Sequence, residues 1–487
     1  QLCPEGMQCT GFRQLRQPVS SDAQRRFNEF CASFPYGEDR CTSADFCNGN
    51  FDDPDCTHAA PLLKAGYYSF AHDPYAVFMC KEKLGCPGGQ PGTCAARRDT
   101  TTVGCSLCLS GSYMNNEECH ACEGVSKLPF IMMCIFGIFG LVFLAYSINK
   151  DLAMRPGSMT TVAILAGVLF TTLQTLATFA SIEIRWVEPV TSVISAMSIL
   201  SFDLNIVRIG CVLDQDPKSQ FAGRLTVLPC CAAFVALTLA FKKRFLNREA
   251  KFVVDLVNTV GSIFSLMFIP IVTSFLAPFI CYQHPGGKQE SMLSAPSILC
   301  FEDPDHNIMM ALGGLAFVTL GLPFITLVAY GTRMYPIYVN NHAVDGLRMF
   351  RFLFIRFHAQ SYYFGGIVLT RNLLVCLVPV LARKDPAMQV LLLVLILMTS
   401  MLIQVWFKPW RPDPSKLKMM DANIIDALLT SGCLMLLFCG ALFTDFTTSQ
   451  EQVQYIAMAI FIIFVIIIAM CLGMAARERL YPKPYYK

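Results

Sequence analysis

The chain has 487 residues, of which 54% are hydrophobic and only 15% are charged, and its mean hydropathy is +0.48. A typical soluble domain carries roughly 25% charged residues, so the composition excludes a wholly soluble enzyme and a disordered chain. The net charge of +3 is too small to indicate a nucleic-acid partner. The composition therefore predicts a multi-pass membrane protein.

The first quarter of the chain is polar and rich in cysteine. Thirteen of the 23 cysteines lie before residue 123, among many Gly, Pro, Asp and Asn residues. Dense cysteine in a small polar domain is typical of disulfide-bonded domains in an oxidising compartment. We therefore interpret residues 1–126 as an extracellular or lumenal domain, exported by a signal peptide that is removed from the mature chain.

Two cysteine pairs in this region leave a second interpretation open. Cys105-Ser-Leu-Cys108 and Cys119-His-Ala-Cys122 have the spacing of a zinc ribbon. Disulfides are the favoured interpretation, because the other nine cysteines of the region indicate export. Zinc held by reduced thiols is the alternative, and a thiol mass measurement would separate the two. We expect no metal and no cofactor.

About 20 apolar residues cross a bilayer as a helix, and nine segments after residue 126 meet this condition. We expect spans at approximately 128–148, 158–181, 225–241, 252–280, 307–331, 361–382, 387–406, 423–445 and 453–475. The expected fold class is an all-α polytopic membrane protein. Its helical domain covers residues 127–476, and residues 477–487 form a cytoplasmic tail.

Basic connections set the expected orientation. Lys and Arg concentrate in the connections 242–248, 333–356 and 408–418 and in the tail, and the positive-inside rule places all four in the cytoplasm. Nine crossings satisfy this placement, with the N-terminus and the 281–306 loop outside. A tenth crossing at the weaker apolar stretch 187–207 would move the first connection outside. We therefore interpret 187–207 as a re-entrant or interfacial helix.

The cysteine count agrees with this orientation. Thirteen cysteines in the N-terminal domain leave one without a partner, and Cys281 can pair with Cys300 in the outer loop. If 187–207 does not cross, Cys211 is outside and can pair with the odd cysteine. The alternative is that Cys211 and one cysteine of the N-terminal domain are free thiols.

A charge lies near the middle of the span 361–382. Arg371, followed by Asn372, is costly to bury, so it is expected to face protein or water and to have a partner. Asp426 and Asp255 are the candidate partners, and both lie nearer the cytoplasmic ends of their helices. The pair would either form an ion pathway or gate latch, or fix helix packing.

Two further features bear on the helices. Pro270 and Pro278 fall in the outer half of the span 252–280, so we expect either a tilted helix with a bent end or a broken helix that lines a cavity. Arg348, Arg351 and Arg356 alternate with phenylalanines, and we expect this segment to lie on the inner membrane surface beside anionic lipid. It would act as an anchor or as a linker that moves the next span.

Several motifs together resemble a known family. The stretch 104–122 resembles the ephrin-receptor-like cysteine module, and the match continues through 296–300, 357–372, Lys408-Pro-Trp410 and Asp421-x-Asn423-x-x-Asp426. This order of parts is similar to a large protist group described as having a TRP-like transmembrane region. The resemblance implies a receptor-like or channel-like surface protein, although the 444–452 loop is too short for a TRP filter and pore helix.

Catalytic motifs for nucleotides, metals and nucleophilic serine are absent from the sequence, so we do not expect an enzyme. The sequence predicts a receptor-like or ion-channel-like protein, with the plasma membrane as its site. A membrane anchor or assembly subunit of a larger complex, or a transporter, is the alternative. The expected partners are membrane lipids, an unknown extracellular ligand or structural partner, and either further copies of the chain or a larger membrane complex.

Overall fold

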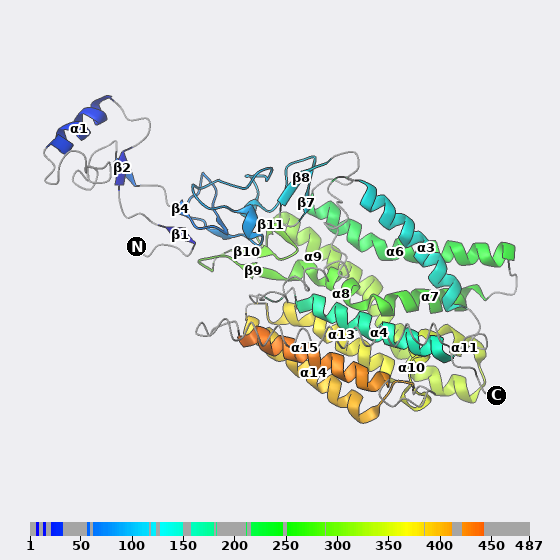
Figure 1. Cartoon of the computed structure of the whole chain (residues 1–487). Helices are drawn as coiled ribbons and strands as arrows, with labels where there is room; N and C mark the ends of the chain where they lie inside the picture. The colour runs from blue at the N-terminus through cyan, green and yellow to red at the C-terminus, as the bar shows by residue number, and fades with distance from the viewer. Residues whose placement is uncertain are drawn as a thin grey trace. The chain divides into compact units, whose positions relative to one another are not determined.

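The computed structural model describes residues 6–8, 13–15, 21–32, 56–58, 62–115, 118–122, 127–149, 157–179, 182, 211, 216–246, 251–287, 289–383, 385–411 and 421–442. Over these residues the protein is mostly helical (Figure 1). The chain divides into two compact units. The cysteine-rich unit comprises Gln1–Cys122, Gln283–Ser291 and Ala295–Cys300, and the helical unit comprises Glu123–Tyr282, Met292–Ser294 and Phe301–Lys487.

Short antiparallel ladders make up much of the cysteine-rich unit. The pairs are β1 (Met7–Gln8) with β4 (Leu62–Leu63), β2 (Arg13–Leu15) with β3 (Cys56–His58), β5 (Tyr67–Tyr68) with β6 (Phe78–Met79), and β7 (Ser112–Asn115) with β8 (Glu118–Ala121). One helix, α1 (Ser21–Ala32), and two 3₁₀ turns, η2 (Lys83–Gly85) and η3 (Val103–Cys105), complete its described elements. Disulfides Cys80–Cys86, Cys94–Cys105 and Cys108–Cys119 cross-link this unit, whose strands are too short to bury a large core.

A loop that lies between two helices in the sequence is built into this unit. It contains β9 (Cys281–Gln283), β10 (Glu290–Met292) and β11 (Ala295–Leu299), which form one sheet in the order β11-β10-β9. The Met79 amide donates a hydrogen bond to His284 Nδ1 at 3.1 Å, and Leu299 packs against the core around Tyr68 and Phe78. The 283–300 segment is therefore held by the same core as the N-terminal strands.

The helical unit contains twelve α-helices among the described residues. Two of them are short and form a linker: α11 (Val344–Met349) and α12 (Arg351–Phe354). The other ten are α3 (Leu128–Ile148), α4 (Gly157–Thr178), α6 (Pro217–Phe241), α7 (Phe252–Leu266), α8 (Phe268–Leu276), α9 (Pro304–Ala316), α10 (Leu322–Asn340), α13 (Phe364–Leu381), α14 (Pro386–Phe407) and α15 (Ala422–Leu442). A π-helical turn, η12 (Phe317–Gly321), joins α9 to α10 without a break.

Five helices in the described residues are long and apolar enough to cross a membrane: Leu128–Ile148, Pro217–Phe245, Pro304–Asn340, Phe364–Leu381 and Pro386–Phe407. A bent pair, Phe252–Leu266 with Phe268–Phe279, makes a sixth if it forms one span. The regions of two further predicted spans hold shorter apolar helices, Val162–Thr178 and Ala422–Phe438. The apolar helices indicate insertion in a membrane, and the disulfides indicate an extracellular region. The predicted number of nine is not confirmed, and 187–207, 453–475 and the tail lie outside the described residues.

The predicted bend in the span 252–280 has a definite position. The helix breaks at Met267 with an angle of 69°, three residues before Pro270 in the first turn of α8. Proline removes the amide that would bond the carbonyl four residues earlier, which here is that of Leu266. Gln174 of α4 donates its side-chain amide to this carbonyl at 3.1 Å. The neighbouring helix therefore satisfies the carbonyl that the proline leaves without a partner.

The helices pack in two groups. In the first, α4, α13, α14 and α15 run alongside one another (Figure 1) and share a buried core that includes Leu393, Leu429 and Leu437. In the second, α8 and α10 share a core with the phenylalanines of the linker helices, and α11 and α12 contact α7. The contact of α13 with both α4 and α8 joins the two groups.

Candidate functional site

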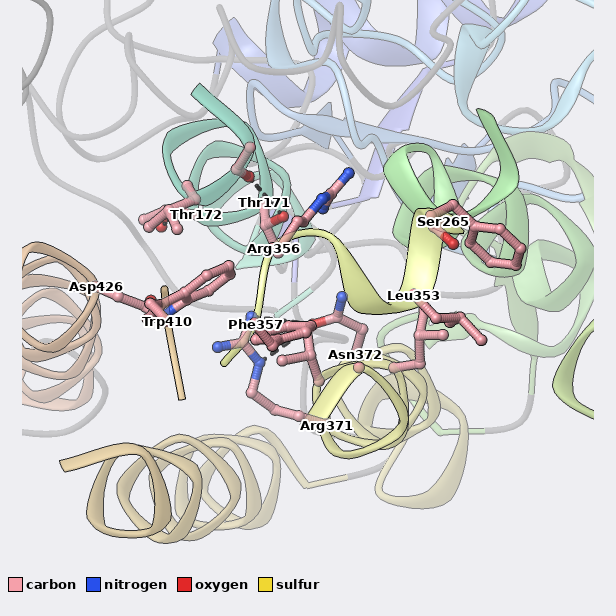
Figure 2. A pocket seen from close by; sticks show the side chains of 16 residues that line it. Thr171, Thr172, Ser265, Leu353, Arg356, Phe357, Arg371, Asn372, Trp410 and Asp426 are labelled. Carbon is pink, nitrogen blue, oxygen red and sulfur yellow. Dashed lines mark hydrogen bonds between the residues drawn. The ribbon is translucent and has the colours of Figure 1, made fainter. Parts of the chain in front are cut away.

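A polar pocket of about 60 Å³ lies inside the helical unit (Figure 2). Its polar and charged lining comes from four helices and two connections: Thr171 and Thr172 of α4, Ser265 of α7, Arg371 and Asn372 of α13, Asp426 of α15, and Arg356 and Trp410 between helices. A polar space of this size holds on the order of four water molecules. The α13 residues of the lining lie in the first half of that helix, Asp426 lies in the second turn of α15, and the α4 residues lie near the middle of α4. The pocket therefore lies within this group of helices, in the half nearest the connections that precede α13 and follow α14.

The chain turns sharply after α14 to bring Trp410 to the pocket. Lys408 has a φ of 44°, a left-handed conformation that ends the helix. The following residues pair with the linker, because the amide of His358 donates to the carbonyl of Pro409 at 2.9 Å and Phe357 forms a bridge with Trp410. Trp410 is only 6% exposed and belongs to the core of the first group.

The Asp421-x-Asn423-x-x-Asp426 motif fixes this tryptophan from the other side. Asn423 Oδ1 accepts a hydrogen bond from the Trp410 amide at 3.1 Å, and Asp426 Oδ2 accepts one from the Trp410 indole Nε1 at 2.8 Å. Asp421 in turn accepts two hydrogen bonds from Asn423. The two motifs that the sequence separates by ten residues therefore form one hydrogen-bonded structure.

Arg371 and Asp426 both line the pocket, but they are not in direct contact. Arg371 donates two hydrogen bonds to Asn372 Oδ1, from Nε at 3.1 Å and from Nη2 at 3.0 Å. Among the described residues no carboxylate lies within ion-pair distance of Arg371, although its charge acts on the Asp426 carboxylate. Figure 2 shows the Arg371 side chain rising from α13 toward Phe357 and Trp410.

Arg356 is the second cation in the pocket. Its side chain extends toward α4, where a Cβ atom on Gly167 would lie 3.6 Å from Nη1 (Figure 2). Burial lowers the pKa of Arg356 below its usual range, and within the described chain no side chain forms a hydrogen bond or ion pair with it. Ser265 Oγ also lies buried without a hydrogen-bond partner in the described part. The pocket therefore presents unused hydrogen-bond donors.

Asp255 has a different partner from the one we expected. It is 2% exposed and forms an ion pair with Arg348 Nη2 at 3.1 Å, so it does not oppose Arg371. Lys251, the residue immediately before α7, pairs with Asp345 on α11. Asn258, one turn later, donates a hydrogen bond to Asn149 of the α3 end at 3.2 Å.

The place of the linker arginines at the inner membrane surface stays a prediction, and the structure shows which protein groups surround them. Arg348 pairs with Asp255, Arg356 lines the pocket, and Arg351 is half-buried with an interaction of its own. The phenylalanines between them face protein: Phe350 and Phe352 are 1% and 6% exposed. These two phenylalanine rings of the linker therefore pack inside the helical unit.

Two glycines leave space for these two rings, because they have no side chain. A Cβ atom on Gly261 of α7 would lie 2.5 Å from Phe352 Cε1, and one on Gly331 of α10 would lie 2.5 Å from Phe350 Cδ1. Both distances are far below normal carbon contacts, so a larger residue would displace the linker. The sequence shows these glycines and phenylalanines, but nothing in their spacing indicates that they meet.

The cysteines singled out in the sequence are all disulfide-bonded. Cys105 pairs with Cys94 and Cys108 with Cys119, which leaves no thiolate set for a zinc ribbon. Cys122, Cys211, Cys281 and Cys300 are also in disulfides. Sequence reasoning missed Thr171, Thr172 and Ser265 as pocket residues, because hydroxyl residues in apolar helices carry no spacing signal that distinguishes a pocket from a helix contact.

No protein-family model, curated protein or solved structure matches this chain. The chemistry of the site must therefore be judged from its own residues. Two guanidinium groups, three hydroxyls, one side-chain amide and one carboxylate that accepts a hydrogen bond from Trp410 surround a small space. Such a set suits binding and conformational change.

Proposed function

We propose that this chain is a cell-surface, receptor-like or channel-like integral membrane protein with nine crossings. The N-terminus would be extracellular and the C-terminus cytoplasmic. The basic connections around residues 242–248, 333–356 and 408–418 support this orientation. Membership of the protist group with a TRP-like region belongs to the same proposal, and its support is that the motifs 357–372, 408–410 and 421–426 meet around one pocket.

The observation that carries the proposal is the composition of the cysteine-rich unit. Residues 283–291 and 295–300 belong to that unit, yet in the sequence the segment 283–300 connects α8 and η11 (Ala277–Phe279) to α9. At the helix end, His306 hydrogen-bonds the carbonyl of Pro278 at 2.9 Å and accepts one from the Phe301 amide at 3.1 Å. A domain that served only as an attachment point would need no such insertion.

The helix α8 provides a path from this segment to the centre of the helical unit. Its residue Thr273 donates a hydrogen bond to the sulfur of Cys376 on α13 at 3.6 Å, and Cys376 lies 3.7 Å from the carbonyl of Ile269. Cys376 is two turns or less from Arg371 on the same helix. A movement of the 283–300 segment would therefore change the α8–α13 contact beside the pocket.

The test uses an antibody fragment raised against the native 283–291 hairpin as a surrogate ligand. Full-length protein in lipid nanodiscs is treated with N-ethylmaleimide, and labelling of individual cysteines is followed by peptide mass spectrometry. We expect the fragment to change the labelling rate of Cys376 several-fold. Cys433, which is equally buried but lies on α15 away from α8, is the matched control and should not respond.

A fragment that binds a C-terminal epitope tag controls for nonspecific effects of binding. If the hairpin-directed fragment leaves both cysteines unchanged, the coupling is wrong and the anchoring alternative is favoured. Native mass and currents in planar bilayers then distinguish the two forms of the proposal. A closed homo-oligomer with currents would support a channel, and an assembly without currents would support a receptor.

A further inference from the structure

The pocket contains more positive than negative charge. Arg356 and Arg371 contribute two positive charges, and Asp426 contributes at most one negative charge. The Asp426 carboxylate already accepts a hydrogen bond from the Trp410 indole at 2.8 Å. The charge of these three groups is therefore at least +1, and both arginine side chains are half-buried, so the excess positive charge favours an anion in the pocket.

The donors that remain in the pocket come from separate elements. Arg356 is without a side-chain partner among the described residues, and Arg371 uses Nε and Nη2 on Asn372, which leaves Nη1. The Ser265 hydroxyl is buried and without a partner in the described chain. Donors from the linker, α13 and α7 thus surround a space of about 60 Å³.

We propose that this pocket is a binding site for a phosphate-type oxyanion, held by Arg356 and Arg371 and by the hydroxyl of Ser265. Guanidinium groups bind phosphate through short, charge-assisted hydrogen bonds, and two of them can contact different oxygens of one anion. A carboxylate ligand would use fewer of the donors, because it has two oxygens. The anion would also neutralise the excess charge. Its binding requires no assumption about the cysteine-rich unit.

The phosphate group can come from two sources. The linker, the first half of α13 and the second turn of α15 contribute pocket residues, and the proposed orientation puts the starts of these two helices at the cytoplasmic side. Either a dissolved phosphate or the headgroup of an anionic phospholipid could therefore supply the anion. The two sources present the same chemistry to Arg356 and Arg371. The experiment therefore has one arm for each source.

The first arm uses the full-length protein, delipidated in detergent. Inorganic phosphate is titrated at constant ionic strength against chloride, and the melting midpoint is measured. The second arm uses nanodiscs of phosphatidylcholine with and without phosphatidic acid, and native mass spectrometry measures the lipid that stays bound. Arg356→Gln is the test variant in both arms. Arg333→Gln is the matched control, because Arg333 is an exposed arginine of α10 that does not line the pocket.

If the site takes a dissolved anion, phosphate should raise the midpoint of the wild type and of Arg333→Gln, with at least tenfold weaker binding in Arg356→Gln. If it takes a lipid, phosphatidic acid should be retained by the same two proteins and lost from Arg356→Gln. If neither ligand distinguishes the two variants, the proposal is wrong. Should Arg356→Gln fail to fold, Ser265→Ala replaces it, and unchanged affinity in that variant would overturn the proposal.

Discussion

Replacing Gly261 by Ala should destabilise the helical unit through the linker. The new Cβ would lie 2.5, 2.7 and 2.9 Å from three ring atoms of Phe352, where normal contacts begin near 3.4 Å. The ring must therefore move by about 1 Å within a packed core, and overpacking of this kind costs about 1–3 kcal/mol. Three simultaneous short contacts favour the upper end. Alanine regains about 1 kcal/mol of helix propensity, so we expect a net loss of about 2 kcal/mol.

The assay is the melting midpoint of the purified protein in one detergent, compared with Gly223→Ala. A Cβ on Gly223 of α6 would meet nothing within 4 Å, so that variant should gain up to about 1 kcal/mol. The two variants should differ by about 3 kcal/mol, or on the order of 6 °C. In a Phe352→Ala background the clash is gone, and Gly261→Ala should no longer destabilise. Equal midpoints for the two glycine variants, or a cost that persists without the ring, would refute the reasoning.

Three further predictions follow from charged and titratable residues. Arg348→Gln should lower the melting midpoint more than Asp255→Asn does. Losing Arg348 leaves the buried carboxylate of Asp255 without its partner, at a cost of up to about 3 kcal/mol. The double variant should have the same melting midpoint as Asp255→Asn. Burial lowers the pKa of His284 from 6.5 to about 4, so the folded cysteine-rich unit takes up fewer protons than the unfolded chain between these values. The stability of this unit should be full above about pH 6.5 and fall by up to about 3 kcal/mol toward pH 4. Hydrogen exchange of the 281–292 strands, corrected for the intrinsic exchange rates, measures this change. The same measurement on His284→Gln should show no pH dependence. Arg371→Gln should leave expression intact and alter the Cys376 labelling response, whereas lost expression would indicate that the charge serves packing.

Much of the helical framework could be predicted from hydropathy and helix-end signals. The predicted span 128–148 coincides with α3, because an uninterrupted apolar run fixes both ends. The span 387–406 coincides with α14 within a residue at each end. Asp385 precedes this helix and accepts hydrogen bonds from the backbone amides of Ala387 and Met388, and Pro386 is its first residue. These signals act within a few residues, so they are visible in a single sequence.

The pairing of charged residues could not be predicted in the same way. Asp255 and Arg348 were each identified as unusual, but their partnership depends on the rotation of α7 and on the approach of α11 to it. The polar residues of α7 mark its inward face, but a single sequence does not indicate which helix meets that face. The same reason explains why the meeting of Gly261 with Phe352, and of Ser265 with the pocket, carried no sequence signal.

Asp255 and Arg371 differ in how firmly they fix the surrounding helices. Asp255 joins α7 to α11 by an ion pair, and the Gly261–Phe352 contact holds the next part of the linker to the same helix. Moving the linker away from α7 would therefore break a buried pair and open a packed contact. The Arg371 side chain, in contrast, hydrogen-bonds only Asn372, its neighbour on α13, among the residues that the structure describes.

Those bonds move with α13 and survive any shift of that helix against α4 or α15. A rearrangement of the helical unit should therefore change the pocket and leave α7, α11 and α12 together as one block. Hydrogen exchange would reveal this as faster opening of α13 than of α7 when the pocket is perturbed.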